Sequence, residues 1–187
     1  DIIKARFVAR SAARQRPLVM WLGVNKLRDE EVALFRDSWA PLSPHVVLVE
    51  PNPQILGPLR ERMKSTGLDD FVVVNAAICV NDSAGVPFYT FSPARFQQAP
   101  PGVSTPLLDL MDEFSSLDKA SALRAAHDIH FLLGACSKED WASFVKSQLM
   151  ELRVRCMAPA TLLKEVSVEP QALDGVIIDI EGQERWI

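Results

Sequence analysis

The sequence has few cysteines, and none of them falls in a recognised pattern. Among 187 residues there are three, Cys79, Cys136 and Cys156, which are widely spaced and form no C-x-x-C pair. An odd number at such spacing argues against a disulfide framework and against a zinc knuckle. We therefore expect no disulfide framework, and we expect a reducing, cytoplasmic compartment.

Long apolar runs and an excess of basic residues are also missing. No apolar run approaches the roughly 18–20 residues of a membrane span. The net charge of −4 does not provide the basic surface that nucleic acid selects. With 48% hydrophobic residues, the chain can bury the core of one ordinary domain. These features exclude a membrane-spanning protein and a nucleic-acid-binding protein.

Several signatures of binding and catalysis are absent. The segment after the first predicted strand lacks the G-x-G-x-x-G pattern of a nicotinamide site, and no G-x-S-x-G hydrolase elbow occurs. His127 and His130 are three residues apart in a helical stretch, with Cys136 nearby. No further ligand has suitable spacing, so we expect no metal site.

Apolar runs alternate with helical patterns along the chain. We predict strands at 18–22, 45–50, 71–80, 86–91, 152–157 and 175–181, and helices at 29–39, 54–66 and 159–166. The stretch 105–150 is mostly helical, and Ser137 with Asp140 three residues on predicts a helix start. This order predicts an α/β fold: a Rossmann-like, doubly wound, mostly parallel sheet with a helical insertion. We expect residues 1–187 to form one domain that continues beyond Ile187, because the sequence stops one turn into a predicted helix.

The stretch "LVMWLGVNKLRDEEVALF" places one glycine, Gly23, between the first predicted strand and the first predicted helix. Glycine-rich cofactor loops occupy this position in nucleotide-binding α/β proteins. Two interpretations stay open: a cofactor loop that has drifted, or a strand–helix turn that never held a ligand.

Acidic residues follow two of the predicted strands. Glu50 lies at the tip of "HVVLVE", where an acid can accept both hydroxyls of a ribose. Alternatively, it caps the next helix. In "IIDIEGQE", Asp179 and Glu181 are two residues apart and point to the same face of a strand. Two carboxylates at a buried strand end are costly unless they are paired, solvated or used, so they would orient a substrate, take a proton or bind a divalent cation.

The third predicted strand contains small residues beside a polar one. Asn75, Ala76 and Ala77 follow one another in "NAAICVND". Small residues at a strand end leave room for a flat base, but ordinary close packing explains them equally well.

Four segments, in this order, resemble the FkbM-type S-adenosylmethionine-dependent methyltransferases: "VVLVEPNP", "NAAICVNDSAG", "ATLLKEV" and "VIIDIEGQE". The family carries an acid-Pro-Asn-Pro turn, an Asn/Ala-Ala strand followed by Asp and Gly, a Thr-Leu before a short helix, and an Asp-x-Glu-Gly-x-Glu ending. The resemblance runs from about Leu18 to the chain end, apart from residues 105–150.

The resemblance implies S-adenosylmethionine as cofactor and O-methylation of a hydroxyl on a small molecule or glycan. Gly23 and Asn25 would flank the methionine portion, Glu50 would hold the ribose, and Asn75 to Ala77 would lie near the adenine. Asp179 and Glu181 would face the methyl group and the acceptor, as the candidates for general base. Carried over by position, the cofactor-binding residues are Gly23, Asn25, Glu50, Asn52, Asn75 and Ala76.

The chain departs from the family in the loop after the first strand. The family's Asp-x-Gly-x-Asn-x-Gly aligns with residues 21–27, so Trp21 replaces the acid and Leu27 replaces the last glycine. We expect the leucine side chain to occupy space at the methionine end of the cofactor. The missing acid removes an indirect partner of the cofactor's ammonium group. The alternative function is therefore a catalytically inactive methyltransferase-like scaffold or interaction domain.

Overall fold

The computed structural model describes residues 16–91, 103, 111–129 and 136–180, and Ala5, Val8 and Ala9. The chain divides into two compact units, one formed by Asp1–Ala84 with Arg155–Ile187 and the other by Gly85–Val154. The fold is α/β, with a four-stranded parallel sheet and a second, mixed sheet. Within the described ranges, no helix is long and apolar enough to cross a membrane.

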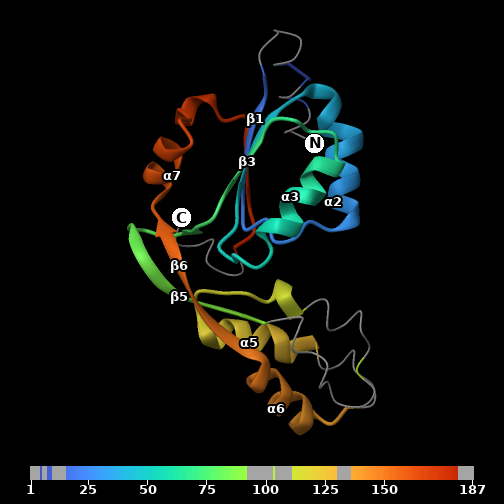
Figure 1. Ribbon diagram of the computed structural model, residues 1–187, viewed down its shortest axis with the longest axis vertical. Coiled ribbons are helices and arrows are strands. Elements are labelled where there is room, and N and C mark those ends of the chain that lie inside the picture. The colour runs from blue at the N-terminus through green and yellow to red at the C-terminus, as the bar shows by residue number, and fades with distance from the viewer. Residues whose placement is uncertain are drawn as a thin grey trace. The chain divides into compact units, whose positions relative to one another are not determined.

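The parallel sheet forms the centre of the first unit (Figure 1). Its strand order is β3-β2-β1-β7, with β1 at Leu18–Leu22, β2 at His45–Val49, β3 at Phe71–Val74 and β7 at Gly175–Ile178. Every neighbouring pair is parallel. The two central strands are almost wholly buried, which explains their continuous apolar sequences, because helices cover both faces of a parallel sheet.

Alternate side chains of β1 enter two different cores. Val19 and Trp21 belong to one cluster of buried residues, and Met20 and Leu22 belong to another. The two-residue period of a strand separates them in this way. Each face of β1 is therefore buried under different helices.

Helices α2 (Asp29–Leu34) and α3 (Leu56–Ser65) cover one face, and α7 (Pro159–Glu165) covers the other (Figure 1). The helix predicted at 29–39 begins where expected but continues as a π-helical turn, Phe35–Trp39. Three acids in the first turn of α2 suit the positive end of the helix dipole. The buried contributions are Phe35 and Trp39 from the turn, Leu59 and Met63 from α3, and Leu162 from α7.

The prediction of one strand over 71–80 is wrong. β3 ends at Val74, and the chain resumes as β4 (Ala77–Ile78) in the second sheet. Between them, the side-chain amide of Asn75 donates to the carbonyls of Glu50 and Pro51, both at 2.9 Å. Backbone groups beyond β2 are thus bonded to a side chain instead of to a longer β3.

The second sheet has the order β4-β6-β5, with β5 at Ser83–Phe91 and β6 at Leu149–Met157. β4 pairs with β6 in parallel through two residue pairs only, Ala77↔Cys156 and Ile78↔Met157. Strands β5 and β6 each run from one compact unit into the other.

The second unit has its own core, built largely by α5 (Lys119–Asp128) and α6 (Lys138–Gln148). The predicted start of α6 is confirmed, because the N–H of Asp140 donates to the Ser137 hydroxyl at 3.0 Å. Trp141 is fully buried, and its indole N–H donates to the Ala126 carbonyl at 2.9 Å. The unit therefore packs around α5 and α6 without using the core of the first unit.

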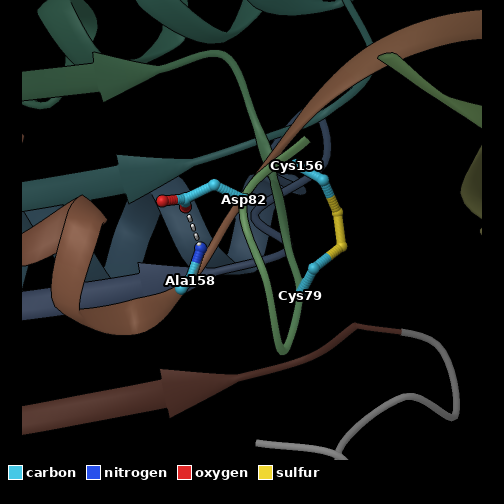
Figure 2. Close-up of a disulfide and its surroundings, with 4 residues drawn as sticks. All are labelled: Cys79, Asp82, Cys156 and Ala158. Atoms are coloured by element: carbon cyan, nitrogen blue, oxygen red, sulfur yellow. Dashed lines mark hydrogen bonds between the residues drawn. A yellow bond between two sulfur atoms is a disulfide. The ribbon is translucent and has the colours of Figure 1, made fainter. Parts of the chain in front are cut away.

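The cysteine spacing argued against a disulfide framework, yet the structure contains one disulfide. Cys79 and Cys156 are joined (Figure 2), with their Cα atoms 5.7 Å apart, as is usual for a disulfide. The N–H of Cys79 also donates to the Met157 carbonyl at 2.9 Å. A sequence separation of 77 residues hid the pairing, because only the β4–β6 contact brings the two positions together.

Candidate functional site

The predicted site residues follow strands of the parallel sheet. The carboxyl ends of parallel strands lie at one edge, so the segments after β1, β2, β3 and β7 share that edge. The chain proceeds from β1 outward to β2 and β3, and later places β7 on the other side of β1. Ligands in open α/β sheets bind where the strand order reverses in this way. Here the reversal is at the ends of β1 and β7.

Gly23 is required by the protein chain itself. Its φ is +77°, a left-handed conformation that L side chains rarely adopt. A Cβ at this position would lie 1.8 Å from the backbone oxygen of Asp179. The N–H of Asp179 in turn donates to the Leu22 carbonyl at 2.9 Å. The single glycine of the loop therefore allows β7 to close against β1, with or without a ligand.

The rest of the loop keeps a glycine-like backbone. Asn25 and Leu27 have φ of 56° and 57°. Asparagine tolerates this conformation, whereas for other side chains it costs roughly 1–2 kcal/mol. The side chain of Leu27 is 2% exposed and lies in the core cluster on the α2 side. The expectation that it fills space at the methionine end of a cofactor is therefore wrong.

Trp21 is also part of that core. Its ring stacks on Phe35 with centroids 5.7 Å apart. Its indole N–H is buried and has no hydrogen-bond partner among the residues that the structure describes. The position has thus become a core position that gives up one hydrogen bond for aromatic packing.

Glu50 joins the loops that follow β1 and β2. One carboxylate oxygen accepts the N–H of Asn25 at 2.8 Å, and the other accepts the N–H of Asn52 at 2.7 Å. The side chain is buried. Helix α3 begins at Leu56, with Ile55 at its N-cap, so Glu50 does not cap it. A carboxylate has about four lone-pair sites, so both oxygens keep one for a further donor.

Burial raises the pKa of Glu50 from its usual 4.5 to about 7. The backbone N–H groups of Asn52 and Asn25 oppose this shift, because they stabilise the ionised form. The carboxyl group therefore changes its charge near neutral pH.

The other predicted cofactor residues hold the strand ends. Asn52 is buried, and its side-chain oxygen accepts the N–H of Gln54 at 3.1 Å. Asn75 binds the carbonyls after β2, as described above. Ala76 is fully buried in the core on the α7 side. Their assignment to cofactor binding stays a prediction.

Asp179 is the acid after β7 that the structure describes, and it is exposed. β7 ends at Ile178, one residue before it. The expectation of a buried carboxylate is wrong here: β7 is the outer strand of the sheet as far as the structure describes the chain, and Val176 and Ile178 are each more than 40% exposed. Solvent therefore removes the desolvation cost. Glu181 and Gly182 lie outside the described residues.

Sequence reasoning missed Asp82. Its carboxylate accepts the N–H of Ala158 at 2.7 Å and the hydroxyl of Thr161 at 2.6 Å. These bonds, the one from Thr161 first, hold the pKa of Asp82 below its usual range. Ala158 is the N-cap of α7 and has no side chain that can cap, so Asp82 caps the helix from a distant part of the sequence.

Metal ligands do not gather in the part of the chain that the structure describes: no group of three His, Cys, Asp or Glu side chains there could hold an ion. His130 lies outside it. Comparison with protein-family models, with curated proteins and with solved structures found no match to this chain.

Replacing Gly23 by alanine should lower the free energy of unfolding by more than about 2 kcal/mol, from left-handed strain and the clash with the Asp179 carbonyl. The matched control is Gly57→Ala, because Gly57 lies in α3 and nothing lies within 4 Å of its added Cβ. That change should alter the free energy of unfolding by less than about 1 kcal/mol, because the gain from replacing a helical glycine is offset by crowding between the new Cβ and Pro58. Urea denaturation measures both, and equal effects would contradict the role assigned to Gly23.

Glu50 should make stability fall as pH rises. Its raised pKa means that the folded state binds more protons than the unfolded state between pH 4.5 and about 7. Its contribution is thus fully present below pH 4.5 and is lost as pH rises through about 7. Between about pH 5 and pH 8 we expect a loss of about 2–3 kcal/mol.

The loss should be absent in Glu50→Gln, which does not titrate. This variant should also be less stable at low pH by about 1–3 kcal/mol, because an amide accepts only one of the two N–H groups. Glu30→Gln, at an exposed carboxyl, should keep the wild-type pH dependence. Urea denaturation at both pH values measures the difference between proteins, and a pH-dependent loss that persists in Glu50→Gln would refute the assignment.

Proposed function

We propose that the chain is a Rossmann-like, doubly wound domain with a helical insertion, and that it is an S-adenosylmethionine-dependent methyltransferase. The observation that carries the proposal is the Glu50 carboxylate, which bonds the loop after β1 to the loop after β2 where the strand order reverses. The family resemblance assigns both loops to the cofactor. We infer O-methylation of a hydroxyl on a small molecule or glycan.

The residues at this edge fit such a cofactor in chemical type. The two N–H donors fix the carboxylate of Glu50, so its remaining lone pairs have set directions for ribose hydroxyls. Asn25 has a left-handed backbone, which asparagine tolerates better than most residues do. The cofactor supplies an electrophilic methyl group on a sulfonium.

The protein's part in the reaction is mainly alignment. Methyl transfer requires the acceptor oxygen to lie in line behind the methyl group, and often a base that takes the hydroxyl proton. Asp179 is the described candidate for this base, because it is exposed at the end of β7, next to the Gly23 loop. Glu181 stays a candidate by position in the sequence.

The second candidate is a methyltransferase-like scaffold without activity. The observation that favours it is Trp21, which packs in the core where the resemblance would place an acid, and whose indole N–H has no partner among the described residues. A site that had lost its ligand would no longer need that acid.

Calorimetric titration with S-adenosylmethionine and S-adenosylhomocysteine separates the two candidates. We expect saturable binding, with a dissociation constant within the roughly 1 µM–1 mM typical of enzyme substrates. Glu50→Gln should weaken it about tenfold or more, the cost of one charged hydrogen bond. Asp179→Asn should leave cofactor affinity within about twofold, since Asp179 is assigned to the acceptor, and Glu30→Gln should leave it unchanged.

Circular dichroism must show that each variant is folded before its titration is interpreted. A folded wild-type chain that binds neither compound would contradict the proposal of a methyltransferase and favour the inactive scaffold. Binding that is unaffected by Glu50→Gln would place the cofactor elsewhere.

A further inference from the structure

The disulfide joins the two segments of the chain that make up the first unit. The first unit ends its first segment at Ala84 and resumes at Arg155, so Cys79 comes shortly before the chain leaves and Cys156 directly after it returns. The bond therefore closes a loop that contains the whole of the second unit. Both cysteines belong to the first unit, and Figure 2 shows them with the neighbouring Asp82 and Ala158.

Beside the disulfide, a small number of hydrogen bonds join residues 77–82 to residues 156–161. The β4–β6 pairing contributes two residue pairs, and the N–H of Cys79 reaches the Met157 carbonyl. Beyond the disulfide, Asp82 holds the start of α7 through Ala158 and Thr161. Asp82 is exposed, so water competes for these bonds. The disulfide thus adds a covalent link between residues 79–82, whose other bonds are open to water, and the start of α7, beside the buried packing of Ile78 and Met157.

The contact continues into the candidate site. Four residues before Cys79, the amide of Asn75 binds the carbonyls of Glu50 and Pro51. Ala76, Ile78, Met157 and Leu162 share one buried core cluster, so the strand-end segment and α7 pack together. Movement of residues 75–82 away from α7 would therefore disturb the turn that carries Glu50.

We propose that the Cys79–Cys156 disulfide is a redox switch: its reduction by a dithiol releases residues 79–82 from the start of α7 and weakens the strand-end site. The effect on the site rests on the proposed function, whereas the release does not. Cys79 is half-buried and Cys156 is 1% exposed, so a reductant reaches the sulfur of Cys79 first.

The exchange conserves atoms and electrons. A thiolate of the dithiol attacks the Cys79 sulfur, forming a mixed disulfide and expelling Cys156 as a thiolate, which takes up a proton. The second thiolate of the dithiol then attacks the other dithiol sulfur, the one bonded to Cys79 in the mixed disulfide. This expels Cys79 as a thiolate, which is protonated in turn. The dithiol is oxidised to a disulfide, and its two electrons reduce the protein to two thiols.

Hydrogen exchange tests the release without any ligand. The oxidised chain and the chain reduced with dithiothreitol are compared at two sets of amides. Reduction should speed exchange about tenfold or more at Cys79 and Ala158, whose N–H groups bond across the contact. Amides of β2, such as those of Val47 and Leu48 in the centre of the sheet, should change by less than about twofold.

The double variant Cys79→Ser, Cys156→Ala should behave as the reduced chain with or without dithiothreitol. Cys136→Ser should respond to dithiothreitol as the wild type does, because Cys136 is not in the disulfide. Unchanged exchange at Cys79 and Ala158 would overturn the proposal. So would equal acceleration at both sets of amides, because the bond would then stabilise the fold as a whole.

Titration of both redox forms with S-adenosylhomocysteine tests the link to the site. We expect reduction to weaken binding about fivefold or more. Equal affinity in the two forms would overturn the link. Local release without binding in either form would contradict the proposed function and still support the release, so the two failures are distinguishable.

Discussion

The buried carboxylate of Glu50 is the interaction on which the strand-end region depends. Its two oxygens accept backbone N–H groups from two loops that are otherwise separate in the sequence. The Asn75 amide then binds the carbonyls of Glu50 and Pro51, so the end of β3 joins the same assembly. Removing the carboxylate would leave buried N–H groups unpaired, which is costly in a low-dielectric setting.

That interaction explains why an ionisable group is tolerated in the interior. Burial favours the protonated form, and the two N–H donors favour the ionised form, so the pKa of Glu50 settles at about 7. A structural carboxylate could be replaced by an amide at little cost if it accepted one bond, but here it accepts two. The same geometry leaves further lone pairs available, so a role in holding the loops is compatible with a role in holding a ribose.

The disulfide constrains the same region, because Cys79 follows Asn75 by four residues. It fixes residues 79–82 near the start of α7, where β4 and β6 contribute two residue pairs. Ile78 and Met157 of these two pairs belong to the buried core on the α7 side, whereas the bonds that Asp82 makes to the start of α7 are exposed to solvent. The covalent bond therefore matters most for residues 79–82, which have few buried contacts of their own. The reducing compartment inferred from cysteine spacing stays a prediction, because a disulfide that is reversibly reduced is compatible with it.

Local patterns in the sequence were sufficient for the starts of the four parallel strands, for the starts of α2 and α6, and for placing Glu50 at a strand end, because hydrophobic period and capping act over a few residues. Tertiary structure alone decided the rest. The break at Asn75, the pairing of Cys79 with Cys156, the capping of α7 by Asp82 and the inward turn of Leu27 all depend on groups far apart in the sequence. Among the described strands, β7 is the outer one beside β1, so the exposure of Asp179 depends on strand order and not on the residues of β7.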